Sequence, residues 1–278
     1  METILDWYSV GRSWLGVEHY PTRDAGSCAA LVVHGFRAWH RWGFFPIVAR
    51  SLVERGIAAF VVALPSSGYG PDGFSGERFA RATVSDDLAA LAKAAEIVRC
   101  RCTCLAGLGH SRGALLLALV CTELDCLAMW SPPRRFGRWS ERQLIVWRSL
   151  GAAPAGTHPE TGQPLAIGIE YLDDLERNDY NARLDAALAG CRTPTCIVAG
   201  EHDIVAPPSH AAELHALLGT TDRHLHIVSG TGHTFGVEHG TPAVSPALAE
   251  AIETTASFFH RCCRPSGNFA TPSNEPRP

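Results

Sequence analysis

The 278-residue sequence has no long run of charges of one sign, and its formal net charge is only -4. Proteins that bind nucleic acid or anionic membranes usually have clustered basic side chains. The charge distribution of this sequence therefore gives no support for binding to either. No apolar stretch approaches the ~18 residues that a membrane helix needs. The first residues also lack a basic segment followed by an apolar one, so we expect no signal peptide and a cytoplasmic location.

Cysteine pairs of the C-x-x-C type are missing, although the chain has ten cysteines. The segment RCRCTC holds Cys100, Cys102 and Cys104 at a spacing of two. On a strand this spacing places three thiols in a row on one face and not around a tetrahedral ion. We therefore expect no metal and no other cofactor. Without a secretion signal, the cysteines are expected to be reduced thiols.

Apolar residues are plentiful, at 46% of the chain, and they occur in short runs bounded by glycine and proline. A hairpin is expected over 3–10 and 13–20, and buried strands over 28–35, 57–65, 103–111, 126–131, 193–200 and 223–230. Helices are expected over 44–55, 84–98 and 112–124 and after Ser245, a helix-capping residue. Strands that are apolar on both faces and alternate with helices predict an α/β fold with a mostly parallel sheet covered on both faces.

One interval breaks this alternation. Residues 132–192 show no clear strand, but they carry helix signals over 140–150 and near 170–177 and 180–189. We interpret them as a helical cap inserted into a core formed by residues 1–131 and 193–264. The composition of residues 265–278 predicts a disordered tail.

The stretch GLGHSRGA, residues 107–114, places Ser111 between Gly109 and Gly113. A strand-like run precedes it and a helix-like run follows, which is the context of a G-x-S-x-G nucleophile elbow. Strand and helix pack closely at such a turn, so the flanking residues must be tiny. The pattern predicts Ser111 as nucleophile and the Arg112 amide, at the helix start, as an oxyanion donor. The alternative is an ordinary turn with an incidental serine.

A serine hydroxyl needs a general base and an acid that orients the base. In this architecture both follow later strands, in the order serine, acid, histidine. Asp203 follows one expected strand within GEHDIVAPP, and His233 follows the next within GTGHTFG. Both are therefore candidates. Glu201 and His202 compete with Asp203, which could also be only a turn or helix-capping residue.

A second oxyanion donor is expected after the first buried strand. Gly35 allows close backbone approach there, and the Phe36 amide would face the site. His34 is expected to brace the loop by hydrogen bonds and not to act in catalysis. Four tryptophans are candidates for substrate contact: Trp39 and Trp42 after this strand, and Trp139 and Trp147 in the insertion. The alternative is that these aromatic residues only pack the insertion against the sheet.

With these motifs in order, the chain from about 28 to 262 resembles the α/β-hydrolase superfamily. HGF, GHSRGA, GEHDIVAPP and GTGHTFG resemble bacterial serine hydrolases related to dienelactone hydrolase, feruloyl esterases and the catalytic domain of prolyl oligopeptidases. The resemblance implies a triad of Ser111, Asp203 and His233, with the Phe36 and Arg112 amides as oxyanion hole. Dienelactone hydrolase itself uses a cysteine nucleophile, so its substrate does not carry over.

The expected function is that of a cofactor-free serine hydrolase acting on small to medium acyl or aryl carboxylic esters through an acyl-enzyme. A small-molecule ester would then be its partner. A peptidase or amidase, or an acyltransferase, could use the same residues. A non-catalytic binding protein on a hydrolase fold is the remaining alternative. Spacing alone does not reveal the substrate, because the pocket depends on how 132–192 fold over the sheet.

Overall fold

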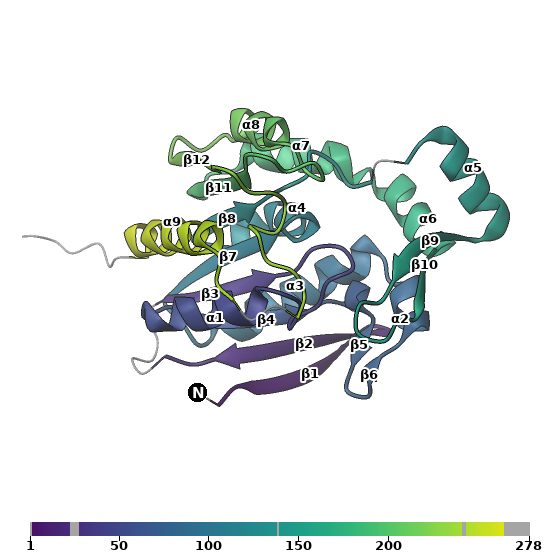
Figure 1. Ribbon diagram of the computed structural model, residues 1–278, viewed down its shortest axis with the longest axis horizontal. Helices are drawn as coiled ribbons and strands as arrows, with labels where there is room; N and C mark the ends of the chain where they lie inside the picture. Colours follow the sequence, from purple (N-terminus) through teal and green to yellow (C-terminus); the bar gives the residue numbers. More distant parts are fainter. Residues whose placement is uncertain (1, 23–27, 138, 241–242, 264–278) are drawn as a thin grey trace, which may run out of the picture.

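An eight-stranded sheet forms the centre of the molecule (Figure 1). The computed structural model describes residues 2–22, 28–137, 139–240 and 243–263. The strand order is β1-β2-β4-β3-β7-β8-β11-β12, in which β1 and β2 form an antiparallel hairpin, β2 is antiparallel to β4, and the other neighbours are parallel. The strands are β1 (Ile4–Val10), β2 (Ser13–Tyr20), β3 (Cys28–Val33), β4 (Ala58–Ala63), β7 (Cys104–His110), β8 (Cys126–Trp130), β11 (Thr195–Gly200) and β12 (Arg223–Val228). The expected mostly parallel sheet is confirmed.

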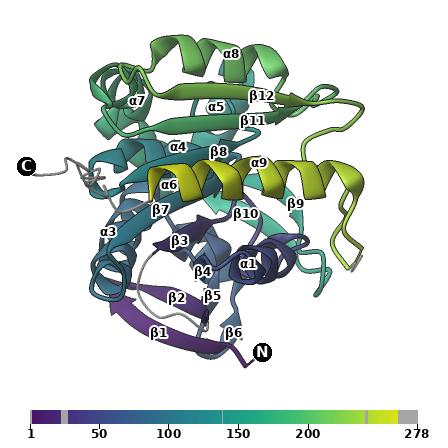
Figure 2. The ribbon, with the colours of Figure 1, turned by 90° about the vertical axis from the view of Figure 1, so that its left-hand side faces the viewer.

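Helices cover both faces of this sheet (Figure 2). One buried apolar cluster packs α3 (Val84–Arg99), α4 (Arg112–Leu119), α7 (Tyr180–Gly190) and α8 (Pro208–Leu217) against one face. A second cluster packs α1 (Phe45–Glu54) and α9 (Pro246–Cys262) against the other. The central strands are buried on both sides because each face has its own layer. As expected, Ser245 caps α9, and its Oγ accepts the Leu248 amide at 2.9 Å.

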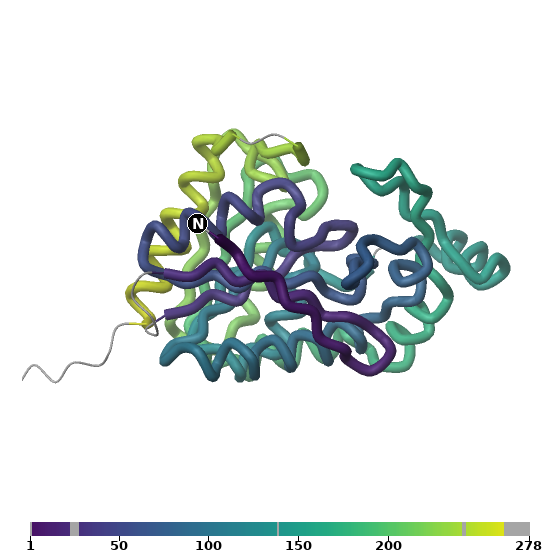
Figure 3. Tube along the Cα trace, turned by 90° about the horizontal axis from the view of Figure 1, so that it is seen from below, coloured from purple at the N-terminus to yellow at the C-terminus, as the bar shows by residue number. Residues whose placement is uncertain are grey.

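The insertion contains the expected helices and also a hairpin. Its helices are α5 (Glu141–Leu150), α6 (Ile169–Asn178) and α7, and its antiparallel strands are β9 (Ala152–Thr157) and β10 (Pro164–Gly168). The expectation of no strand here was wrong. The β9 sequence AAPAGT has no β-branched or aromatic residue except its final threonine, so it lacks the signal on which strand prediction depends. Figure 3 shows α5 and the hairpin at one end of the molecule and the C-terminal end of α9 at the other.

The stretch after β4, which is rich in glycine, proline and serine, also forms regular structure. It contains the turn η1 (Pro65–Ser67), the short strands β5 (Tyr69–Gly70) and β6 (Gly73–Phe74), and the helix α2 (Gly76–Arg81). Ser75 caps α2 by accepting the Arg78 amide. Across the described parts of the chain, no helix is both long and apolar enough to cross a membrane. The predicted tail, 265–278, lies outside the described residues.

The cysteine expectations need two corrections. Helix α3 continues to Arg99 and β7 begins only at Cys104, so Cys100 and Cys102 precede the strand and the three thiols do not share it. Cys104 is also joined to Cys263 by a disulfide, so these two cysteines are not reduced. They are 159 residues apart in sequence. Only the packing of the end of α9 beside the start of β7 brings them together, and the sequence pattern carries no sign of this contact.

Candidate active site

Ser111 occupies a strained turn between β7 and α4. Its backbone angles are φ 53° and ψ -125°, in a region that residues other than glycine rarely adopt. A Cβ at position 109 would lie 2.5 Å from Ala114 Cα, and a Cβ at position 113 would lie 2.5 Å from the carbonyl oxygens of Val33 and His34. Both flanking glycines are therefore required by backbone atoms that cannot move aside. The turn has the geometry of a nucleophile elbow.

The start of α4 is fixed from two sides. The Ser111 amide donates to Trp130 O at 2.8 Å, and Arg112 is the first residue of the helix, where no intrahelical carbonyl accepts its amide. The buried Arg112 side chain lies 2.8 Å from the carboxylate of Asp87 in α3 and also contacts Ser66 Oγ. Its guanidinium lies over the Phe36 ring, 5.5 Å from the centroid. The buried ion pair joins α3 to α4, and the contact with Phe36 links them to the loop after β3.

Asp203 and His233 meet at the carboxyl edge of the sheet. Asp203 follows β11 and His233 follows β12, and His233 Nδ1–H donates to Asp203 Oδ2 at 2.7 Å. The other carboxylate oxygen accepts the amides of Val205 at 2.8 Å and Ala206 at 2.7 Å. Burial alone would raise the pKa of the Asp203 carboxyl, but the hydrogen bonds from His233 and the Ala206 amide outweigh it and lower the pKa. Asp203 is thus held as a carboxylate that orients the imidazole.

The competitors of Asp203 lie elsewhere. Glu201 is exposed and accepts hydrogen bonds from Ser229 Oγ at 2.6 Å and the Gly230 amide at 2.9 Å. It therefore closes the turn after β12. His202 is also exposed. Of the three candidates in GEHD, Asp203 is the one that the structure pairs with His233.

His110 is a positioning residue that sequence reasoning missed. It is the last residue of β7, and its Nε2–H donates to the carbonyl oxygen of His233 at 2.9 Å. Burial lowers the pKa of His110 to about 3, so the ring is neutral at ordinary pH. Its place directly before Ser111 was the available signal, but sequence alone does not show that the ring reaches the loop after β12.

The loop after β3 passes very close to Ser111. A Cβ at Gly35 would lie 3.0 Å from Ser111 Cβ and 3.2 Å from His110 O, so the missing side chain permits this approach. His34 braces the loop, as expected. Its Nδ1–H donates to Gly35 O at 2.8 Å, and its Nε2 accepts the Leu64 amide at 3.1 Å. Phe36 follows Gly35 and lines the same cleft as Ser111.

Ser111 and His233 line one cleft of about 760 Å³. The other lining residues come from the β3 loop (Gly35, Phe36, Arg37, Ala38, Trp42), from β7 and the insertion (His110, Trp139, Pro154, Ala155, Gly156, Thr157, Pro159, Ile167), and from the loops after β11 and β12 (Val205, Thr234, His239). A recess of about 150 Å³ also reaches Ser111, with Phe136, Trp139 and Tyr171 among its walls. Two cavities therefore border Ser111, and both are also lined by Phe36, Trp139 and Val205.

No protein-family model matches the chain. Solved structures do match it over nearly all of its length. Est1E from Butyrivibrio proteoclasticus, solved with ferulic acid bound, is 14% identical with a TM-score of 0.70 and covers 92% of this chain and 98% of its own. Monoglyceride lipase from Saccharomyces cerevisiae is 13% identical with a TM-score of 0.71, and the match covers 94% of this chain and 97% of the lipase. Dienelactone hydrolase from Anabaena variabilis is 13% identical with a TM-score of 0.61 and covers 94% and 97%. The chain has the α/β-hydrolase fold.

Among curated proteins, the polyketide synthase ThaQ of Burkholderia thailandensis is 36% identical over 90 residues. This match spans 32% of the present chain and 4% of the synthase. It therefore reports a local likeness within a very much longer protein. The α/β-hydrolase fold itself rests on the structural matches and on the strand order.

Within the α/β-hydrolase fold, the four candidate tryptophans divide into two pairs. Trp42 and Trp139 line the cleft. Trp39 is 3% exposed and stacks on His158, with ring centroids 4.9 Å apart, so it packs the insertion against the core. Trp147 is fully buried beside Trp139, with ring centroids 5.0 Å apart. The structure thus places Trp39 and Trp147 outside the cleft, as packing residues. The sequence did not show this, because their burial depends on tertiary packing.

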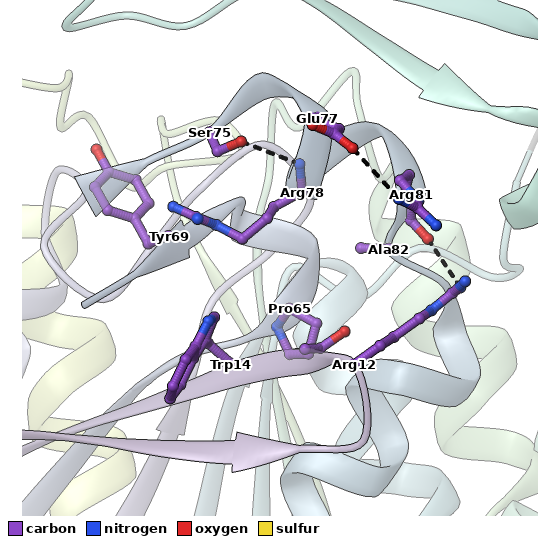
Figure 4. Close-up of a pocket in the computed structure, with 10 residues that line it drawn as sticks. Arg12, Trp14, Pro65, Tyr69, Ser75, Glu77, Arg78, Arg81 and Ala82 are labelled. Carbon is purple, nitrogen blue, oxygen red and sulfur yellow. Dashed lines mark hydrogen bonds and ion pairs between the residues drawn. The ribbon is translucent and has the colours of Figure 1, made fainter. Parts of the chain in front are cut away.

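A separate pocket of about 240 Å³ lies between β2, η1 and α2 of the α/β-hydrolase fold (Figure 4). Its lining includes Arg12, Arg78 and Arg81, with Trp14 on one side. These arginines already have acidic neighbours: Asp86 at 3.6 Å from Arg12, Asp72 at 2.9 Å from Arg78, and Glu77 at 3.3 Å from Arg81. The pocket contains none of the triad candidates, and its cationic charge is largely balanced.

Proposed function

We propose that this chain is a serine hydrolase that cleaves small to medium acyl or aryl carboxylic esters. The observation that carries the proposal is the 2.7 Å hydrogen bond from His233 to buried Asp203, in a cleft that His233 shares with Ser111 on a strained elbow. In this proposal Ser111 Oγ attacks the ester carbonyl and His233 Nε2 takes its proton. The Phe36 and Arg112 amides stabilise the oxyanion.

The same groups complete the reaction. The protonated His233 returns its proton to the leaving alcohol, while Asp203 stabilises the imidazolium. A water molecule, deprotonated by His233, then attacks the acyl-enzyme, and Ser111 leaves with the proton. No step requires a cofactor.

The spaces beside Ser111 support the substrate class. A dry apolar cavity of about 150 Å³ holds one benzene molecule in another protein. The recess beside Ser111 has a similar volume, about 150 Å³, but it is open, and Arg112 and Arg135 line it together with aromatic side chains. We infer that its aromatic part takes an aryl or short acyl group. The adjoining cleft of about 760 Å³ admits the remainder of the ester. Ferulic acid, which is bound in the structure of Est1E, is an aromatic carboxylic acid.

Acyl transfer to an acceptor other than water is a second candidate. The observation behind this candidate is the local likeness to a polyketide synthase. In that case Ser111 and His233 keep their roles, but the acyl group arrives on a thiol or alcohol and leaves on a different nucleophile. Hydrolysis is our first proposal, because a lipase and a dienelactone hydrolase match nearly all of this chain, whereas the synthase match spans 32% of it.

The proposal is tested by comparing Ser111→Ala with Ser149→Ala, in which an exposed serine of α5 is changed. We expect Ser111→Ala to lose fluorophosphonate labelling, and its ester turnover to fall by several powers of ten. Ser149→Ala should behave as the wild type. Full labelling of folded Ser111→Ala would refute the assignment of the nucleophile.

An acyl-length series of aryl esters and thioesters defines the substrate. We expect rates to peak at short or aromatic acyl groups. Rates that rise steadily to long chains, with activation at an oil-water interface, would indicate a lipase instead. Rapid thioester turnover that yields acylated amine or alcohol in preference to free acid would favour the acyltransferase.

A further inference from the structure

Three cysteine sulfurs gather at the edge of the sheet opposite the candidate active site. Cys28 is the first residue of β3, Cys104 is the first residue of β7, and Cys263 follows α9. Their Sγ atoms all lie within 4.8 Å of one another. Because β3 and β7 are parallel and lead to Gly35 and Ser111 at their other ends, the cluster is ~20 Å from the nucleophile.

The disulfide in this cluster has a third sulfur in contact with it. Cys104 is bonded to Cys263, and the Cys28 Sγ lies 3.0 Å from the Cys263 Sγ. Cys28 and Cys104 are also directly paired on neighbouring strands, so the sheet holds both sulfurs beside the end of α9. A rigid scaffold therefore presents one disulfide sulfur to two possible partners.

We propose that Cys28, Cys104 and Cys263 form a thiol–disulfide exchange site, in which Cys263 pairs alternately with Cys104 and Cys28. The thiolate of Cys28 attacks the Sγ of Cys263. The Cys28–Cys263 bond forms, the Cys104–Cys263 bond breaks, and Cys104 leaves as a thiolate that takes up a proton. One disulfide and one thiol are present before and after, so the step needs no oxidant. Its result is that the end of α9 is tied either to β7 or to β3.

The surroundings of Cys28 set the rate of this step. Burial raises the pKa of the Cys28 thiol to about 12, and Cys102, Asp125 and Cys262 add to the increase. Only the thiolate attacks, so exchange is slow near neutral pH. Because the thiolate fraction changes about tenfold per pH unit below the pKa, the exchange rate should rise about tenfold from pH 7 to pH 8 and again to pH 9.

The test uses the full chain, oxidised with glutathione disulfide, alkylated after acid quenching and mapped by non-reducing peptide mass spectrometry. We expect Cys104→Ser to form a Cys28–Cys263 disulfide. Cys28→Ser should retain only Cys104–Cys263. In the wild type, the alkylated fractions of Cys28 and Cys104 should add up to one. The rate at which these fractions reach equilibrium should rise with pH. Circular dichroism and the thermal midpoint establish that each variant is folded, and Cys104→Ala provides a second variant of the same position.

Several outcomes would overturn the proposal. One is folded Cys104→Ser or Cys104→Ala that keeps Cys28 and Cys263 as free thiols under conditions that fully oxidise the wild type. A disulfide from Cys263 to a different cysteine is another. A third is reduced wild-type protein that binds one equivalent of Zn²⁺ and thereby protects all three cysteines from alkylation, because the cluster would then be a metal site. None of these readouts depends on esterase activity, so the outcome is independent of the proposed function.

Discussion

Gly113 illustrates, at the scale of a single residue, how little space the turn at Ser111 leaves. A methyl group there would lie 2.5 Å from two backbone carbonyl oxygens, whereas a methyl group at Gly190, at the end of α7, would meet nothing within 4 Å. We predict that Gly113→Ala lowers the free energy of unfolding by about 1–3 kcal/mol, as overpacking does, and slows fluorophosphonate labelling of Ser111. Urea unfolding and labelling rates measure the two effects.

Gly190→Ala is the matched control. It adds the same methyl group to a helix without a clash, so we expect unchanged labelling and an increase in stability of up to about 1 kcal/mol. If both variants behave alike, the close approach of α4 to the loop after β3 is not what requires glycine at 113.

The sequence predicted these residues unequally, for physical reasons. Ser111, Asp203 and His233 follow strands in a fixed order, and the pattern of small residues around each is local in sequence. The role of His110 depends on a contact with a loop 123 residues away, and no local pattern records it. Trp139 precedes the expected helix over 140–150 and Trp147 lies within it, but the sequence does not show that Trp139 lines the cleft and Trp147 is buried outside it.

At the scale of secondary-structure elements, one buried ion pair joins α3 to α4. Asp87 and Arg112 have side chains 0% and 7% exposed and lie 2.8 Å apart. Removing one partner of a buried pair leaves the other charge without compensation, which typically costs about 3–5 kcal/mol. We therefore predict that Asp87→Asn lowers the free energy of unfolding by about that amount, measured by urea denaturation.

The exposed pair of Lys93 and Glu96, on the same helix, provides the comparison. Its side chains are 42% and 66% exposed, so water already screens the interaction. Glu96→Gln should change stability by less than about 1 kcal/mol. Equal effects of Asp87→Asn and Glu96→Gln would mean that the buried pair does not hold the two helices together.

Elements were predictable where they bury a regular apolar pattern and not where they lack one. The central strands are runs of valine, leucine and alanine buried on both faces, and the sequence analysis found them all. The β9–β10 hairpin is built from small residues with a mixed burial pattern, so it has no such signal. Helix α2 was hidden within a glycine-rich stretch for the same reason.

At the scale of the whole molecule, the sheet was predictable but the covalent link across it was not. The order of apolar runs determined a parallel sheet with two helical layers, and crossover connections leave few alternatives. The disulfide from Cys104 to Cys263 depends on where α9 ends over that sheet. The position of the end of α9 results from tertiary packing. Both cysteines also lie beside other cysteines in the sequence, so the sequence does not show which two are paired.

The stability of the whole molecule should depend on pH through histidines buried at its centre. Burial lowers the pKa of His34 and of His110 to about 3 each, whereas a histidine in an unfolded chain titrates near 6.5. Between these values the unfolded state binds protons that the folded state does not bind. The free energy of unfolding is therefore retained above pH ~6.5 and falls as the solution is acidified, by up to about 1.4 kcal/mol per pH unit for each histidine.

We predict that His34→Gln reduces this dependence. Glutamine can still donate to Gly35 O and accept the Leu64 amide, but it does not titrate. Its stability is expected to be lower than that of the wild type at neutral pH. Between about pH 5.5 and 4.5 its free energy of unfolding should fall less steeply than that of the wild type, by about 1.4 kcal/mol per pH unit. Urea unfolding at a series of pH values gives the slope directly. His260→Gln, which changes an exposed histidine of α9, should keep the slope of the wild type. If the free energy of unfolding of His34→Gln falls with pH as steeply as that of the wild type, His34 accepts a proton in the folded protein.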